Sequence, residues 1–238
     1  MIHKFPFTFQ FIESEYQKII NLGYQIITCA DYVEAKKQPF IKLMVNRVDI
    51  DFSVKKTSEI LNIYDRLGIK ATFFVRLHAP EYNPFSFENY KILKRIKDEG
   101  HELGYHSEII DQSTIWDEDA EACLLRDIEV LNKMFNSNIV GIASHGGMTG
   151  LNNLDFWKNK NASDYGLLYE AYDKQPEFNL FQEAFYVSDS EWTQWKAYDK
   201  GLLCKEDRRS PSEHALDGHN LLHLLIHPDT YYKEHIYE

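Results

Sequence analysis

The sequence predicts an α/β fold built on a parallel sheet or barrel, and three observations support this expectation. Segments typical of buried strands alternate with segments of helical periodicity along most of the 238 residues. The chain contains no internal repeat, low-complexity tract or linker-like stretch. Single α/β barrels routinely occupy about 200 to 250 residues. We therefore expect one domain over residues 1–238.

The first half of the chain alternates strand and helix. Residues 1–35, with a possible strand at 24–28, come before this alternation and are expected to form an accessory N-terminal segment. Residues 40–50 form an apolar run typical of a buried strand. Ser53 can cap the following helix, and Gly68 can end it. The next elements follow in the order strand, helix and strand, at residues 71–75, 87–99 and 101–106.

The second half begins with a longer helix, expected at about 116–135. Asp117, Glu118 and Asp119 would lie in its first turn, where the helix dipole favours negative charge. Its apolar residues form one stripe, which can cover a sheet. Further strands, each a short apolar run, are expected at 139–144, near 167–172, at 184–188 and at 221–226.

The composition limits the classes of partner. The chain has 26 Lys and Arg residues against 37 Asp and Glu residues, a formal net charge of −11, and such a surface repels nucleic acid and anionic lipid. No apolar run reaches the roughly 18 residues that a membrane span requires, and residues 1–11 lack the features of a signal peptide. Cys29, Cys123 and Cys204 suggest neither a disulfide framework nor a zinc ribbon. We expect a cytoplasmic protein with no integral membrane segment and no nucleic-acid partner.

Polar side chains follow four of the expected strands at their carboxyl ends. In a parallel α/β fold these ends lie on one face, so residues far apart in the sequence can meet in one pocket. The residues are Asp49 and Asp51, His106 and Glu108, His145, and His227.

These residue types suit a metal site with acid and base groups beside it. Asp49 and Asp51 point to the same side of an extended strand, and two close carboxylates can divide the roles of cation ligand and base. His106 offers an imidazole ligand for Zn²⁺ or another divalent ion, and His227 is placed to act as a general acid. Each residue also has a structural interpretation: Asp51 can help to cap a helix, and a core histidine can simply bond a backbone carbonyl.

Three segments and a short final one resemble a polysaccharide deacetylase domain of the NodB-homology type, carbohydrate esterase family 4. They are Arg47–Ser53, Gly68–Val75, Gly100–Ser107 and residues 224–228. The resemblance implies a distorted (β/α) barrel over residues 40–230 and a metal-dependent hydrolase that removes an N- or O-acyl group from a carbohydrate. By position it implies Asp49 as the base, Asp51 and His106 as metal ligands, and His227 as the general acid.

One departure from the family pattern concerns the third metal ligand. Ile110 stands where the second histidine of the motif H-[ST]-x-x-H is expected. We favour His145 as the replacement, because one imidazole for another preserves charge and softness, with Glu108 and Asp111 as alternatives. His145 can equally belong to a plain glycine-rich turn. Ile110 is also the best sign of a rival function: a catalytically degenerate fold that binds a sugar or a partner protein.

The expected cofactor is a divalent metal ion, with zinc as the favoured metal. The expected substrate is an acylated sugar, such as a nucleotide-linked or lipid-linked intermediate of surface polysaccharide biosynthesis. A metal-dependent amidase or phosphoesterase on a related barrel is a third interpretation. Several aromatic residues could stack on sugar rings, although aromatics in such numbers more often lie in the core. They are Trp157, Tyr165, Tyr169, Tyr172, Trp192 and Trp195.

Overall fold

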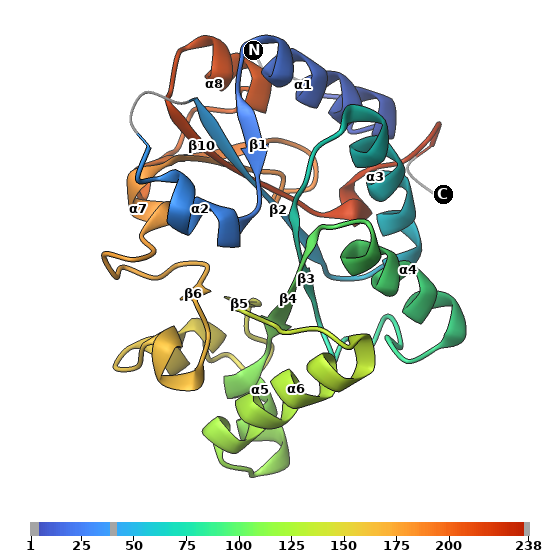
Figure 1. The fold of residues 1–238 in the computed structure, drawn as a ribbon, viewed down its shortest axis with the longest axis vertical. Coiled ribbons are helices and arrows are strands. Elements are labelled where there is room, and N and C mark those ends of the chain that lie inside the picture. Colours follow the sequence, from blue (N-terminus) through green and yellow to red (C-terminus); the bar gives the residue numbers. More distant parts are fainter. Residues whose placement is uncertain (1–4, 39–41, 236–238) are drawn as a thin grey trace.

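The computed structural model describes residues 5–38 and 42–235 and shows a mostly parallel central sheet that curves into a distorted (β/α) barrel (Figure 1). The strand order is β6-β5-β4-β3-β2-β10-β7-β8-β9, and β1 pairs with the first half of β2. Neighbours are parallel from β6 to β7, and β8 and β9 are antiparallel. The expected fold class is confirmed. The strands are β1 Gln25–Ile27, β2 Leu43–Ile50, β3 Thr72–Val75, β4 Glu102–Ser107, β5 Gly141–Ser144, β6 Tyr169–Glu170, β7 Phe185–Ser188, β8 Lys196–Asp199, β9 Leu202–Cys204 and β10 Leu221–Ile226.

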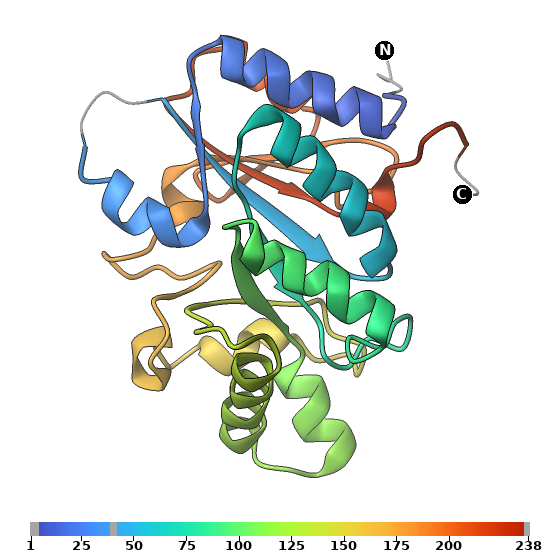
Figure 2. The ribbon, with the colours of Figure 1, turned by 45° about the vertical axis from the view of Figure 1, so that its right-hand side comes forward.

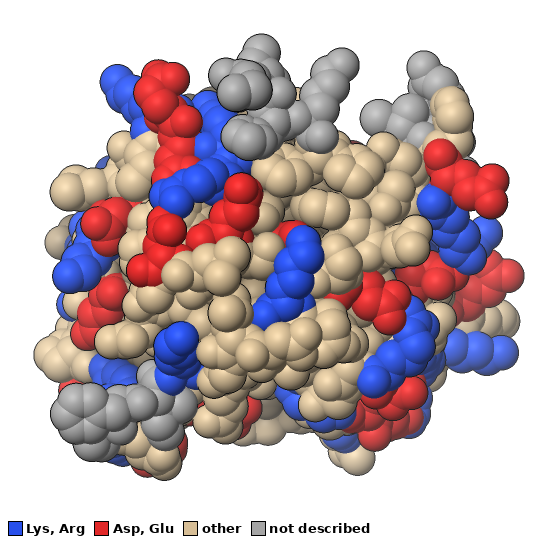
Figure 3. All heavy atoms as spheres, turned by 90° about the horizontal axis from the view of Figure 1, so that it is seen from above, with Lys and Arg blue, Asp and Glu red and all other residues tan. Residues whose placement is uncertain are grey.

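Helices cover the outside of the sheet. Helices α1, α3 and α4 lie side by side along it, and α8 packs beside α1 (Figure 2). The face that carries α1 and α8 mixes acidic and basic side chains (Figure 3). No helix in residues 5–38 or 42–235 is long and apolar enough to cross a membrane. The helices are α1 Phe9–Asn21, α2 Cys29–Ala35, α3 Val54–Leu67, α4 Phe87–Asp98, α5 Ile109–Trp116, α6 Ala120–Phe135, α7 Leu180–Glu183 and α8 Pro211–Leu216, with 3₁₀ turns at Asn153–Trp157, Ala162–Tyr165 and Pro228–Thr230.

Local capping signals explain where α3 begins and ends. The Ser53 side chain accepts a hydrogen bond from the backbone N–H of Lys56, and Gly68 adopts the left-handed conformation, with φ 65°. The helix expected at 116–135 starts later than predicted, because Asp117 takes a left-handed conformation that ends α5. Asp119 then caps α6 by accepting from the backbone N–H of Ala122 at 2.9 Å.

The alternation of side chains along β2 separates two apolar clusters. Met44, Val48 and Ile50 belong to the large cluster that also contains the apolar residues of α1, α3 and α4. Leu43 and Val45 belong to a smaller cluster on the other face of the sheet. The same alternation places Arg47, Asp49 and Asp51 on this second, inner face. The paired carboxylates therefore point to one side, as the strand pattern predicts.

The ends of the sheet differ from the expectations in two places. Strand β1, from the segment at residues 1–35, pairs in parallel with β2, so this segment contributes directly to the central sheet. The antiparallel strands β8 and β9 were not predicted. Lys200 and Gly201, with φ of 48° and 78°, form the tight turn between them.

Candidate active site

The structure brings all five predicted site residues together at the carboxyl ends of the strands. His106 Nε2 lies 3.3 Å from Asp49 Oδ2 and 3.3 Å from Asp51 Oδ1. Asp51 Oδ2 lies 3.9 Å from His145 Nε2 and 3.7 Å from His227 Nε2. Asp51 is therefore at the centre of the group, with three imidazoles around its carboxylate.

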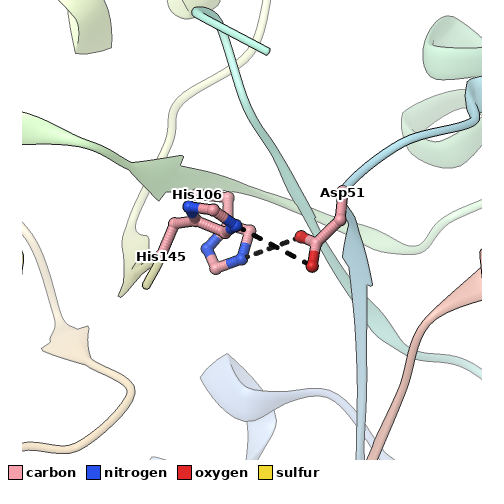
Figure 4. A group of neighbouring side chains, drawn as sticks. All are labelled: Asp51, His106 and His145. Atoms are coloured by element: carbon pink, nitrogen blue, oxygen red, sulfur yellow. Dashed lines mark ion pairs between the residues drawn. The ribbon is translucent and has the colours of Figure 1, made fainter. Parts of the chain in front are cut away.

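Asp51, His106 and His145 form a candidate metal centre (Figure 4). One ligand atom from each residue lies within 4.8 Å of the other two. The Nδ1 of His106 donates to the carbonyl of Ala143 at 2.9 Å, so its Nε2 faces the carboxylates and is the nitrogen that could bind a metal ion. Asp51 Oδ1 is buried, and its contact with His106 Nε2 at 3.3 Å does not have the geometry of a hydrogen bond. One carboxylate and two imidazoles suit Zn²⁺ and similar ions, so the residues present fit the metal that the sequence predicts.

Neither alternative third ligand belongs to this group of ligand atoms. Glu108 Oε1 pairs with Arg76 Nη2 at 2.7 Å and lies 3.7 Å from His145 Nδ1, at the edge of the group. The Asp111 carboxylate accepts from the backbone N–H groups of Met148 and Thr149 and from the Asn153 side chain. Asp111 thus acts as an anchor for the loop after β5.

This anchored loop places His145. Its backbone N–H donates to the Ser107 carbonyl at 2.9 Å, and its own carbonyl accepts from Asn153 Nδ2 at 3.2 Å. The loop folds tightly on itself, because a Cβ atom at Gly147 would lie only 1.6 Å from the Leu151 carbonyl oxygen. The path of the backbone therefore requires Gly147, the second of the two glycines after His145.

The Ile110 side chain packs against the large apolar cluster, and its backbone N–H donates to Asn153 Oδ1 at 2.9 Å.

Asp49 is fixed by a buried ion pair. Arg47 Nε and Nη2 donate to its two oxygens at 2.8 and 2.7 Å, and both side chains are almost fully buried. Burial favours the neutral carboxyl, but Arg47 and His106 outweigh it and lower the pKa of Asp49 below its usual value. Asp49 is an ionised carboxylate at neutral pH.

His227 is oriented by Asp189, which is fully buried. His227 Nδ1 lies 2.6 Å from Asp189 Oδ1, and the His227 backbone N–H donates to the same carboxylate. Burial opposes the charged imidazole, but Asp189 and Asp51 outweigh burial and raise the pKa of His227 to about 9. The pKa of Asp51 is held below its usual range, because His106, His227 and His145 together outweigh the effect of burial, and His106 contributes most.

Sequence reasoning missed the partners of these residues. Asp189 directly follows β7, so the rule applied to the other strands, a polar residue at the carboxyl end, would have found it. Arg47 and Asp49 are two residues apart, so they share the inner face of a buried strand. An unpaired charge is costly there, and this could have indicated that the two residues pair. Arg76, whose Nη1 donates to the Asp51 carbonyl at 2.9 Å, follows β3 in the same way.

Comparisons with known proteins agree with this architecture. Residues 36–164, just over half of the chain, match the family model described as polysaccharide deacetylase. The Streptococcus pyogenes deacetylase PplD in complex with acetate shares 15% sequence identity and has a TM-score of 0.50, with 92% of this chain and 82% of that chain covered. This likeness indicates a shared fold. No curated protein matches the sequence.

Two solved structures of a CE4-family pseudoenzyme from Bacillus anthracis are also similar. The wild type shares 17% identity with a TM-score of 0.47, covering 80% of this chain and 56% of that chain. A mutant with restored enzymatic activity shares 16% identity with a TM-score of 0.47, covering 80% and 58%. The chain thus spans less than three fifths of the length of these structures.

Proposed function

Because the chain belongs to the polysaccharide deacetylase family, we propose that it is a metal-dependent hydrolase that removes an N- or O-acyl group from a carbohydrate. The observation that carries this proposal is the convergence of Asp51, His106 and His145, with Asp49 and His227 beside them. A carboxylate base and an imidazole acid beside a cation site are the groups that acyl transfer to water needs.

Each side chain has a distinct role in this proposal. Asp51, His106 and His145 hold a divalent ion, and such an ion polarises an acyl carbonyl and acidifies water. Asp49 accepts the proton of the attacking water, because Arg47 keeps its carboxylate ionised and in place. His227 donates a proton to the departing nitrogen or oxygen.

Asp189 supports that last step without contact with the substrate. It holds the His227 ring through Nδ1, so Nε2 faces the site, and it keeps the imidazole protonated at neutral pH.

Two exposed aromatic rings favour a sugar as the substrate. The rings of Trp192 and His227 are 5.5 Å apart, and the rings of Trp192 and Phe52 are also 5.5 Å apart. Phe52 and Trp192 are 42% and 40% exposed, so their faces can be reached from solvent. Flat aromatic faces next to the general acid suit the apolar face of a pyranose ring. Nucleotide-linked and lipid-linked acyl sugars are the intermediates that we propose to test first.

The test combines metal content with acetate release. Metal-free protein is loaded with Zn²⁺, Co²⁺, Mn²⁺ or Ni²⁺ and assayed on a panel of N-acetyl and O-acetyl sugars, simple amides and phosphate esters. We expect Asp51→Asn and His106→Gln to lose metal and activity together. Asp49→Asn should keep its metal and lose turnover by about 100- to 10,000-fold, because a base and a ligand are separate functions. Asp65→Asn, an exposed change on α3, serves as the control.

Three results would contradict the proposal. Equal metal loss in Asp49→Asn would make Asp49 a ligand. Activity on amides or phosphate esters alone would favour the other metallohydrolase classes. A wild-type protein that binds no metal and releases no acetate, while binding acylated sugars or a protein partner, would favour the degenerate binding role.

A further inference from the structure

A second group of possible metal ligands lies far from the candidate active site in the fold. It consists of His214, Asp217 and His219, which we name the α8 cluster. The cluster spans the end of α8 and the turn that leads into β10, and it therefore lies at the amino end of β10. The candidate active site lies at the carboxyl ends of the strands, so the two groups occupy opposite ends of the barrel.

The local backbone brings the three side chains together. His214 is in the last turn of α8, and Asp217 follows three residues later, where a helical turn places it on the same side. Gly218 has φ 85°, a left-handed conformation that reverses the chain and returns His219 toward the helix. One ligand atom from each of the three residues lies within 4.8 Å of the other two.

His214 lacks the partners that a buried imidazole normally has. It is fully buried, and neither Nδ1 nor Nε2 has a hydrogen-bond partner among the described residues. Buried polar groups are almost always paired with protein, water or an ion. Both rings of the cluster pack against Phe185, with centroid distances of 4.4 Å for His214 and 4.1 Å for His219. Phe185 thus holds two imidazoles close together without satisfying their nitrogen atoms.

We propose that the α8 cluster binds one divalent cation of the zinc class through His214, Asp217 and His219. Two imidazoles and one carboxylate are ligands that Zn²⁺, Co²⁺ and Ni²⁺ accept, and they leave a position for water. Arg209 forms ion pairs with Asp217 and Asp207, so its guanidinium competes with the cation for Asp217. Asp207 Oδ1 lies 3.6 Å from His214 Nε2 and adds a second carboxylate at the edge of the cluster.

The position of the cluster indicates a structural role for the ion. Tyr24 Oη donates to the backbone carbonyl of His219 and lies 3.2 Å from that of Ala215, so the segment before β1 is already attached to this turn. A cation held by His214 and His219 would join the end of α8 to the start of β10 at the same place. The site would stabilise the fold without taking part in the reaction, and this inference does not depend on the proposed function.

The experiment counts zinc ions in protein that has been stripped of metal. Equilibrium dialysis against Zn²⁺ is followed by elemental analysis of the wild type and of four variants. Asp217→Asn and His219→Gln alter only exposed or half-buried side chains, so they should fold. His106→Gln removes a ligand of the other site, and Glu206→Gln is an exposed control close to the cluster in sequence. We expect two zinc equivalents in the wild type and in Glu206→Gln, and one in each of the other three variants.

Thermal unfolding gives an independent readout. Zinc should raise the Tm of His106→Gln, and the rise should disappear when His219→Gln is added to it. Two zinc equivalents in both Asp217→Asn and His219→Gln would overturn the proposal. A single wild-type equivalent that is lost in His106→Gln would also overturn it while leaving the proposed function intact. A single equivalent lost only in His219→Gln and Asp217→Asn would support the α8 cluster and contradict the proposed metal centre.

Discussion

Replacing His223 by leucine should remove about 2 kcal/mol of the stability that the fold loses between pH 7 and pH 5. His223 lies on β10 within the sheet, is fully buried, and neither of its ring nitrogens has a hydrogen-bond partner in residues 5–38 and 42–235. Its ring packs against Tyr186 with a centroid distance of 4.9 Å. Burial, with a further contribution from the charge of Arg47, lowers the pKa of His223 to about 3.

The sign and size of the effect follow from this lowered pKa. Above pH 6.5 the residue is neutral in both the folded and the unfolded chain, so its contribution does not depend on pH. Below pH 6.5 the unfolded chain takes up a proton that the folded protein refuses until about pH 3. Stability is therefore lost as pH falls, by about 2 kcal/mol from this one residue between pH 7 and pH 5.

Urea unfolding at pH 7, 6 and 5 measures this contribution. The free energy of unfolding of His223→Leu, relative to the wild type, should increase by about 2 kcal/mol over that range, because all other titrating groups are shared. His235→Leu, at an exposed position, controls for the loss of one histidine. A difference between His223→Leu and the wild type that stays constant from pH 7 to pH 5 would refute the reasoning. His223 would then take up its proton in the folded protein as readily as in the unfolded chain.

Three further predictions concern the candidate active site. Asp111→Asn should weaken zinc affinity by roughly 10- to 100-fold, because the loop that positions His145 loses its anchor; calorimetric titration measures this, and unchanged affinity would contradict it. Asp189→Asn should lower kcat by about 100-fold or more with the metal content unchanged, since only the general acid His227 is disturbed; loss of metal in the same samples would reject this role. Ile110→His should lower the Tm without tightening zinc binding, because the side chain packs in the apolar cluster; stronger binding would show that residue 110 reaches the metal.

Strong local signals explain the parts of the fold that the sequence predicts well. The strand β2 is an uninterrupted buried run, and α3 is delimited by Ser53 and Gly68, whose conformations depend mainly on their own neighbours. Helix α5 escaped prediction because it has eight residues and no side-chain cap at its start. The hairpin β8–β9 was not predicted because its strands have only four and three residues, too few to show an alternating pattern.

The candidate site also has a part that the sequence predicts and a part that it does not. The meeting of Asp51, His106 and His145 follows from one rule, that the carboxyl ends of parallel strands share an edge. The pairing of Asp189 with His227 depends on β7 and β10 being neighbours, with Ser188 opposite Leu225. Asp189 follows β7 and could have been placed at this edge by the same rule, but only the order of the strands in the sheet shows that it lies beside His227.

Anomalous diffraction at the zinc absorption edge, from crystals grown with Zn²⁺, tests the central claim most directly. The account predicts an anomalous peak in contact with the Asp51 carboxylate and with Nε2 of both His106 and His145. A peak bound by Asp49 or Glu108 in place of His145, or no peak among these residues at saturating zinc, would contradict it.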